Sequence, residues 1–187
     1  MNIVVKMIAA LALIGIISGA LLSQISGWAE PQIAVHRQEA TEHAIYLVLP
    51  GAKDYKKIET VDYELYEALD GSGNSVGYAL PIEGNGFQGK IRLMVGVKDD
   101  LKQVTGLKIL EQVETPGLGA KVSEDNFTKQ FTGISSVPQV EWVKGVAPSK
   151  DNEIQAITGA TISSKSVVAI INDGLAQLRS AEEGGKL

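Results

Sequence analysis

The chain has 187 residues, contains no Cys and only two His, and carries a formal net charge of −5. The missing thiols exclude a Cys-ligated iron–sulfur cluster, a c-type haem site and a Cys-based zinc site built by this chain alone. The acidic balance, without a basic stripe, argues against nucleic acid as a partner. We therefore predict no metal site and no catalytic residue, so any redox chemistry requires an organic cofactor or a partner protein.

The N-terminus is a long apolar segment. Residues 3–22 are apolar or small except for Lys6 and Ser18. A helix needs about 20 such residues to cross a bilayer, so we predict a transmembrane anchor over residues 1–27. The positive charge at its start predicts a cytoplasmic N-terminus, a single pass through the cell membrane and an extracytoplasmic globular part. A cleaved signal peptide is the alternative, because residues 27–29 (Gly-Trp-Ala) have the small-x-small pattern of a cleavage site.

The remaining chain alternates strand-like and helix-like segments. Several short strands follow one another, and helices stand at the edges of this series. That order predicts an α+β domain with a mainly antiparallel sheet and flanking helices. By pattern and turn residues, we expect strands at 58–69, 76–82, 90–98, 103–113 and 140–146, and helices at 36–49, from Ser123 and at 160–180.

A glycine-rich segment at residues 84–89 spells G-x-G-x-x-G, the pattern of a dinucleotide-binding turn. That site needs a strand before the glycines and a helix N-terminus after them, where backbone N–H groups meet the pyrophosphate. Residues 90–95 are typical of a strand instead. The glycines therefore predict a wide hairpin turn and not a nucleotide site.

A hydroxyl-rich motif opens the last predicted helix. We expect Thr158 to cap this helix, which places Thr161 in the first turn among N–H groups that have no intrahelical partner. A phosphate bound there gains from these donors and from the positive end of the helix dipole. An ordinary capped helix start is the alternative interpretation, because capping threonines are common. The motif consists of Thr158, Gly159, Ala160 and Thr161, followed by Ser163 and Ser164.

A second motif lies upstream and predicts a rigid turn. Pro116 fixes φ and Gly117 can adopt a positive φ, as a type II turn requires. Leu118 is then held at the tip of the turn, where it can pack on a flat ring. A tight turn with an exposed leucine is the alternative. The motif consists of Glu114, Thr115, Pro116, Gly117, Leu118 and Gly119.

These two motifs, together with residues 86–89 (Gly-Phe-Gln-Gly) before a strand, resemble an FMN-binding domain. The resemblance is to the G subunit of Rnf-type ferredoxin:NAD⁺ oxidoreductase complexes, and more distantly to the C subunit of Na⁺-pumping NADH:quinone oxidoreductase. It implies an FMN-binding domain over residues 86–180. Residues 28–85 would then be the N-terminal part of the extracytoplasmic domain, and residues 181–187 a disordered tail.

The resemblance also implies a function. A flavin transferase would cleave FAD and join its FMN half to Thr161 through a phosphoester bond. The chain would be an electron carrier without independent catalysis, in a membrane complex of integral and peripheral subunits that translocates ions. Lys121 is a further candidate partner for the flavin or its phosphate. The family usually carries Asp at the position of Gln155. The expected cofactor-binding residues are Glu114, Thr115, Pro116, Gly117, Leu118, Gly119, Thr158, Gly159, Ala160, Ser163, Ser164 and Lys165.

Two other functions remain as alternatives. The first is a flavoprotein of another redox system, either the quinone reductase or an exported flavin carrier. The second is a membrane-anchored assembly or binding module without cofactor, in which both motifs are only turns and caps.

Overall fold

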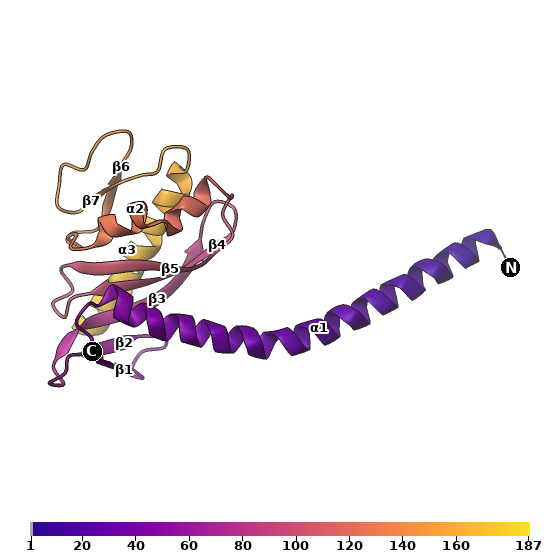
Figure 1. Ribbon diagram of the computed structural model, residues 1–187, viewed down its shortest axis with the longest axis horizontal. Coiled ribbons are helices and arrows are strands. Elements are labelled where there is room, and N and C mark those ends of the chain that lie inside the picture. Colours follow the sequence, from indigo (N-terminus) through magenta and orange to yellow (C-terminus); the bar gives the residue numbers. More distant parts are fainter. Residues whose placement is uncertain (1) are drawn as a thin grey trace. The chain divides into compact units, whose positions relative to one another are not determined.

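The computed structural model describes residues 2–187 of the chain (Figure 1). The chain divides into two compact units, one that ends at Ala40 and one that runs from Thr41 to Leu187. Within the described residues, the elements follow in the order α1 (Ile3–Val48), β1 (Asp54–Lys57), β2 (Tyr66–Leu69), β3 (Ser75–Asn85), β4 (Lys90–Val97), β5 (Val104–Gln112), the 3₁₀ helix η1 (Gly119–Ser123), α2 (Asp125–Thr128), the 3₁₀ helix η2 (Lys129–Phe131), β6 (Glu141–Val143), β7 (Glu153–Gln155) and α3 (Thr161–Glu183).

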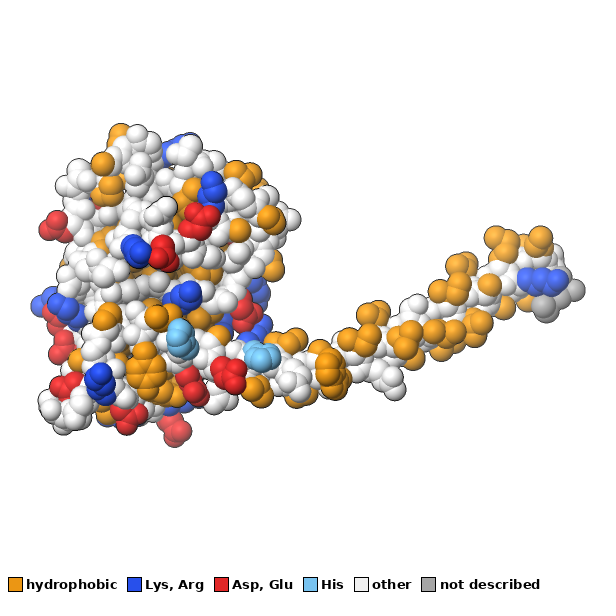
Figure 2. All heavy atoms as spheres, viewed as in Figure 1, with side chains coloured by type: hydrophobic (Ala, Val, Ile, Leu, Met, Phe, Trp, Pro, Cys, Tyr) orange, Lys and Arg blue, Asp and Glu red, His pale blue; other side chains and the backbone are white. Residues whose placement is uncertain are grey.

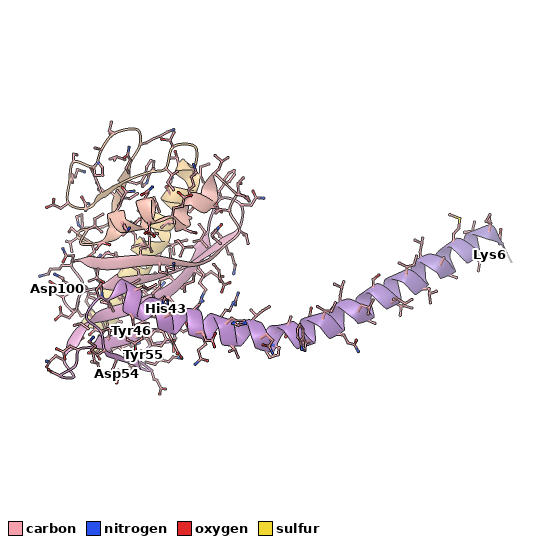
Figure 3. All side chains as sticks on the ribbon, in the orientation of Figure 1. Lys6, His43, Tyr46, Asp54, Tyr55 and Asp100 are labelled. Carbon is pink, nitrogen blue, oxygen red and sulfur yellow. The ribbon has the colours of Figure 1, made fainter. Side chains whose placement is uncertain are left out.

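Helix α1 begins with an apolar stretch that is long enough to cross a membrane. The large hydrophobic side chains of this stretch are exposed (Figure 2), and Lys6 lies near the N-terminal end of the helix (Figure 3). The expected long apolar N-terminal helix is confirmed. The expectation of a separate helix at 36–49 is wrong, because α1 continues without interruption to Val48. The helix therefore extends beyond the apolar stretch, and its last turns belong to the second unit.

The second unit is built on an antiparallel sheet whose strand order is the chain order, β1 to β5. Strands β3 and β4 pair along almost their whole length, and Asn85 faces Lys90 at the end of the hairpin. The Gly86 N–H donates to the Gly89 carbonyl with an N–O distance of 2.6 Å, which closes the turn. The glycine-rich segment is thus the predicted hairpin turn, and the predicted α+β class is confirmed.

The two faces of this sheet carry different cores. Side chains alternate along a strand, so Leu93 and Val95 point to the face that packs against α3, while Met94 points to the other face. On that other face the last turns of α1 pack through buried Ala44, Ile45 and others. Each fully buried aliphatic or aromatic side chain contributes about 1.5–3 kcal/mol. Residues 41–48 of α1 are therefore an integral part of the domain.

Aromatic side chains at the C-terminal end of α1 pack against the edge of the sheet. The ring of Tyr46 meets the ring of Tyr55 on β1 edge to face, with centroids 6.0 Å apart (Figure 3). Tyr55 in turn meets Tyr66 on β2 with centroids 5.6 Å apart. Such edge-to-face pairs add about 0.5–1.5 kcal/mol each to the area that they bury.

Two predicted strands differ from the structure. The segment 58–69 is not one strand, because only β2 is extended there and residues 58–65 form a loop that the Ile58 N–H to Leu65 carbonyl bond closes. Apolar side chains in this loop pack against the core, and this spacing resembles a strand. The preceding strand β1 is polar and lies at the sheet edge, so it has no apolar alternation to reveal it.

The predicted strand at 140–146 shortens to β6, which pairs in parallel with the three-residue β7. Ser123 does not begin a helix; it ends η1, and Glu124 precedes α2 without a side-chain cap. The second difference arises because residues 119–131 form short 3₁₀ and α turns around buried Phe127 and Phe131. Tertiary packing, not capping, fixes these turns.

A pair of glycines allows the C-terminus of α1 to lie against the sheet. Gly96 on β4 faces Gly106 on β5. A Cβ added at Gly96 would lie 2.4 Å from the carbonyl oxygen of Val48, and one at Gly106 would lie 2.9 Å from the Val48 Cα. The Thr105 hydroxyl donates to the same carbonyl with an Oγ1–O distance of 2.6 Å. The sheet therefore needs glycine at both positions.

We predict that Gly96→Ala destabilises the domain by about 1–3 kcal/mol, because the new methyl group overlaps backbone that cannot move away. For a protein of this size the unfolding midpoint would fall by about 2–4 °C per kcal/mol. Trp142 fluorescence during heating of the full chain in detergent, in a Trp28→Phe background that leaves Trp142 as the fluorescent tryptophan, measures it. Gly71→Ala is the control, since its Cβ would meet only the Lys53 Cγ, at 3.9 Å. Equal midpoints for the two variants would refute the proposed contact.

Candidate functional site

A cavity of about 450 Å³ lies at the N-terminus of α3. This volume is within the roughly 300–1,000 Å³ that small-molecule sites occupy. Three of its lining side chains are large, apolar and unusually exposed: Phe87 at 60%, Leu118 at 50% and Ile162 at 56%. They come from the β3–β4 turn, the loop after β5 and the first turn of α3. The cavity thus offers apolar walls to a flat ligand.

Among residues 2–187, no side chain caps the start of α3. Thr161 is the first helical residue, and the preceding Ala160 makes no side-chain hydrogen bond to the helix. Gly159 has φ of +85°, so the chain makes a turn between Thr158 and the helix. This turn is why the expectation that Thr158 is the N-cap is wrong. In the described part of the chain, the first N–H groups of α3 beside the cavity therefore have no intrahelical or capping partner.

The two serines that follow Thr161 are buried and engaged inside the protein. Ser163 donates its hydroxyl to the Glu114 carboxylate. Ser164 donates to the Ala160 carbonyl and accepts the Ile157 N–H, each at 3.0 Å between heavy atoms. These bonds shape the loop that leads into α3. They also use hydroxyls that the sequence suggested for the ligand.

Glu114 is the central polar group beneath the cavity. Its side chain is buried, and Oε1 accepts the N–H groups of Phe87 and Gln88, both at 2.9 Å. Its other oxygen accepts the Ser163 hydroxyl. Burial alone would raise the pKa of Glu114, but the hydrogen bonds from Ser163 and from the backbone outweigh burial and lower it. One carboxylate thus joins the β3–β4 turn to the first turn of α3.

The loop after Glu114 has the predicted tight turn. The Leu118 N–H donates to the Thr115 carbonyl with an N–O distance of 3.2 Å, and Gly117 has φ of +73°. Gly119 follows, where a Cβ would come within 2.8 Å of both the Glu114 carboxylate and the Ser163 hydroxyl. The turn therefore packs directly on the Glu114–Ser163 pair and holds Leu118 at the cavity.

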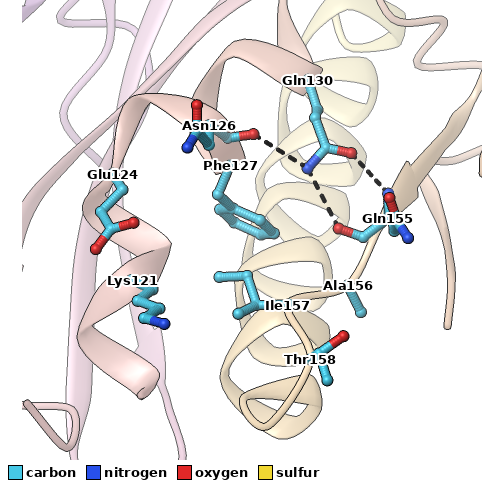
Figure 4. Close-up of a pocket in the computed structure, with 9 residues that line it drawn as sticks. All are labelled: Lys121, Glu124, Asn126, Phe127, Gln130, Gln155, Ala156, Ile157 and Thr158. Carbon is cyan, nitrogen blue, oxygen red and sulfur yellow. Dashed lines mark hydrogen bonds between the residues drawn. The ribbon is translucent and has the colours of Figure 1, made fainter. Parts of the chain in front are cut away.

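A second, smaller cavity of about 260 Å³ lies beside the first and shares Thr158 with it (Figure 4). Here the side-chain amide of Gln130 makes two hydrogen bonds to the backbone of Gln155. It accepts the Gln155 N–H at 2.8 Å and donates to the Gln155 carbonyl at 3.2 Å. Lys121 also lines this smaller cavity. The position of the segment before Thr158 is therefore fixed through backbone hydrogen bonds, which do not depend on the side chain at position 155.

Comparison with known proteins shows the family of this chain. Residues 86–176 match the FMN-binding domain family. The chain is 30% identical to the G subunit of the ion-translocating oxidoreductase complex of Methanosarcina acetivorans over 190 residues, which covers 97% of each chain. The chain belongs to this G-subunit family. It is also 38% identical to the G subunit of the Na⁺-translocating ferredoxin:NAD⁺ oxidoreductase complex of Acetobacterium woodii, over 74% of this chain and 70% of that protein.

Solved structures agree with this family assignment at the level of the fold. NqrC of Shewanella oneidensis matches with a TM-score of 0.56 and 19% identity, over 71% of this chain and 74% of that one. The C subunit of the Na⁺-translocating NADH-quinone reductase from Parabacteroides distasonis matches with a TM-score of 0.54 and 28% identity, over 60% and 59% of the two chains. The domain therefore has the fold of these proteins.

The fold of this G-subunit family member brings most of the predicted site residues to one place. Those that line the large cavity are Thr115, Leu118, Gly119, Thr158, Gly159, Ala160, Thr161 and Ser163. Within residues 2–187, the lining does not include Glu114, Pro116, Gly117, Ser164 or Lys165. Glu114 and Ser164 instead support the loops, as their hydrogen bonds show. Lys165 is exposed on α3.

The sequence analysis did not predict three of the residues that line the cavity: Phe87, Lys144 and Ile162. Phe87 stands inside the glycine-rich turn and Ile162 beside Thr161, so an exposed apolar residue within each motif was the available signal. Lys144 lies outside every motif. Only the pairing of β6 with β7 brings it to the site.

We predict that Glu114→Gln destabilises the domain by about 1–3 kcal/mol at neutral pH, because it removes the charge that three hydrogen bonds share. Thermal unfolding of the full chain measures this, with the exposed Glu59→Gln as the control. The lowered pKa sets the pH dependence. Stabilisation by ionised Glu114 is complete above the ordinary value of 4.5 and is lost as the pH falls through the folded-state pKa.

The difference between wild type and Glu114→Gln should therefore shrink on acidification. A difference that stays constant from neutral pH to below the folded-state pKa would contradict a structural role of the ionised carboxylate.

Proposed function

We propose that this chain carries FMN, joined by a phosphoester bond to the hydroxyl of Thr161, and passes electrons within a membrane-bound, ion-translocating ferredoxin:NAD⁺ oxidoreductase of the Rnf type. The observation that carries the proposal is the uncapped start of α3 beside an apolar cavity. A helix N-terminus favours a phosphate through its free N–H groups and its dipole. Residues 86–176 match the FMN-binding family, which supports the choice of ligand.

Thr161 is the best placed of the hydroxyls around the cavity. Ser163 and Ser164 already bond to Glu114 and to the Ala160 carbonyl. Thr158 precedes the Gly159 turn and stands outside the helix. Thr161 alone combines a position on the first helical turn, a cavity-lining side chain and partial exposure. A phosphate on its oxygen would lie next to the free backbone donors.

The residues of the chain would hold and orient the cofactor. The isoalloxazine ring of FMN supplies the electron chemistry, and the protein supplies position and electrostatics. Phe87, Leu118 and Ile162 offer apolar surface for the ring. The Glu114 carboxylate fixes the spacing of the two loops that bear Phe87 and Leu118. A covalent link would prevent loss of the cofactor by dilution on the outer side of the membrane.

The proposed cellular setting follows from α1. Its apolar stretch would span the cell membrane once, with Lys6 on the cytoplasmic side and the domain outside. A flavin transferase would load the cofactor there. The electron donor and acceptor would be other integral and peripheral subunits of the complex, as expected for a family whose members are named subunits of such assemblies.

Thr161→Ala should abolish covalent flavin. The full chain is co-expressed with a flavin transferase, denatured, separated by electrophoresis and viewed under ultraviolet light, and intact mass is measured in parallel. Wild type and Thr161→Ser should show a fluorescent band and the added mass of FMN less one water. Thr158→Ala is the matched control, because it removes a neighbouring hydroxyl of the same cavity and should retain the band.

Fluorescence that persists in Thr161→Ala, or that disappears in Thr158→Ala alone, would show that Thr161 is not the attachment site. A wild-type chain of unmodified mass after this co-expression would refute the covalent link itself.

A further inference from the structure

Lys144 is brought to the cavity by a pairing of two very short strands. It directly follows β6, in which Val143 faces Gln155 of β7 in parallel register. The Val143 carbonyl accepts the Ala156 N–H at 2.8 Å between heavy atoms. Ala156 is two residues before Thr158, so the backbone beside Lys144 is hydrogen-bonded to the segment that leads into the site.

The loop between β6 and β7, which begins with Lys144, has a defined conformation at both of its ends. Gly145 turns the chain immediately after Lys144 with φ of +70°. Further along, the buried Glu153 carboxylate accepts the Ser149 N–H at 2.8 Å and its hydroxyl at 3.1 Å. Lys144 therefore stands at a defined place on the cavity wall, although its side chain is exposed.

Lys144 is the only charged residue among the described residues that line this cavity. Within residues 2–187, no carboxylate forms an ion pair with it. Lys150 on the same loop is different, because its ammonium lies 2.7 Å from the Glu141 carboxylate and 3.3 Å from that of Glu153. The ammonium of Lys144 can thus interact with a ligand bound in the cavity.

We propose that Lys144 raises the reduction potential of the bound flavin. This inference rests on the proposed function. The oxidised ring is neutral, and it becomes an anion when it takes up two electrons and one proton. A nearby ammonium stabilises that anion and has little effect on the neutral oxidised form, so the equilibrium moves toward the reduced ring. The electrons come from the redox partners of the chain and, in a titration, from dithionite.

The ring and not the phosphate is the group on which this charge acts. The phosphate would meet the free N–H groups at the start of α3, and its charge is the same in both redox states. Lys165 is one rival cation, since it lies one helical turn after Thr161. It does not line the cavity within the described residues, and it therefore serves as the comparison.

The test is a redox titration of the flavinylated full chain in detergent, followed by the visible absorbance of the flavin. Lys144→Gln should reduce the stability of the reduced form relative to the oxidised form about three- to tenfold, which is about 15–30 mV for a two-electron couple. Lys144→Arg keeps the charge and should retain the wild-type potential. Lys165→Gln should shift the potential much less. At about 1 M salt the shift in Lys144→Gln should shrink, because screening is then strong.

An unchanged potential in flavinylated Lys144→Gln overturns the proposal, as does an equal or larger shift in Lys165→Gln. Slower flavin attachment with an unchanged potential also overturns it, because the charge would then act on the phosphate. Failure of the proposed function is a separate result: the wild-type chain itself would carry no flavin after co-expression with the transferase.

Discussion

The buried carboxylate of Glu114 is the interaction on which the site depends. An ionised group inside a protein is costly unless hydrogen bonds replace its water, and here Phe87, Gln88 and Ser163 supply three donors. These donors lie on two segments that are distant in sequence from Glu114. The carboxylate cannot be satisfied unless all three segments meet. Its burial therefore fixes the walls of the cavity relative to one another.

The hydroxyl groups near this carboxylate bond in a way that leaves the first N–H groups of α3 without a side-chain cap among the described residues. Most helices satisfy their first N–H groups with a Ser, Thr, Asp or Asn cap. Here Ala160, whose methyl group cannot accept a hydrogen bond, occupies the capping position, and the hydroxyls of Ser163 and Ser164 bond to other groups. A missing cap costs stability, typically about 1 kcal/mol. A helix start without a cap, adjoining an apolar cavity, is what an anionic ligand with a flat ring requires.

The sequence predicts the parts of this site that depend on local geometry. Pro116 and Gly117 specify their turn through φ alone, and the glycine-rich segment specifies a hairpin because a strand follows it. Contacts between distant segments are not predictable in this way. Glu114 looks like a ligand in the sequence, since nothing there reveals that its partners are two backbone N–H groups and a serine. Lys144 depends on a three-residue strand pair, which is too short for any pattern.

The sheet separates helix α3 from the last turns of α1. Its one face packs under α3, which begins at the cavity, and its other face receives the last turns of α1 through Gly96 and Gly106. The Val48 carbonyl bonds to Thr105 and lies too close to the sheet for any side chain at those glycines. The apolar helix thus ends inside the core and not in a flexible linker. Movement of these last turns would have to deform the sheet, whose other face packs against α3.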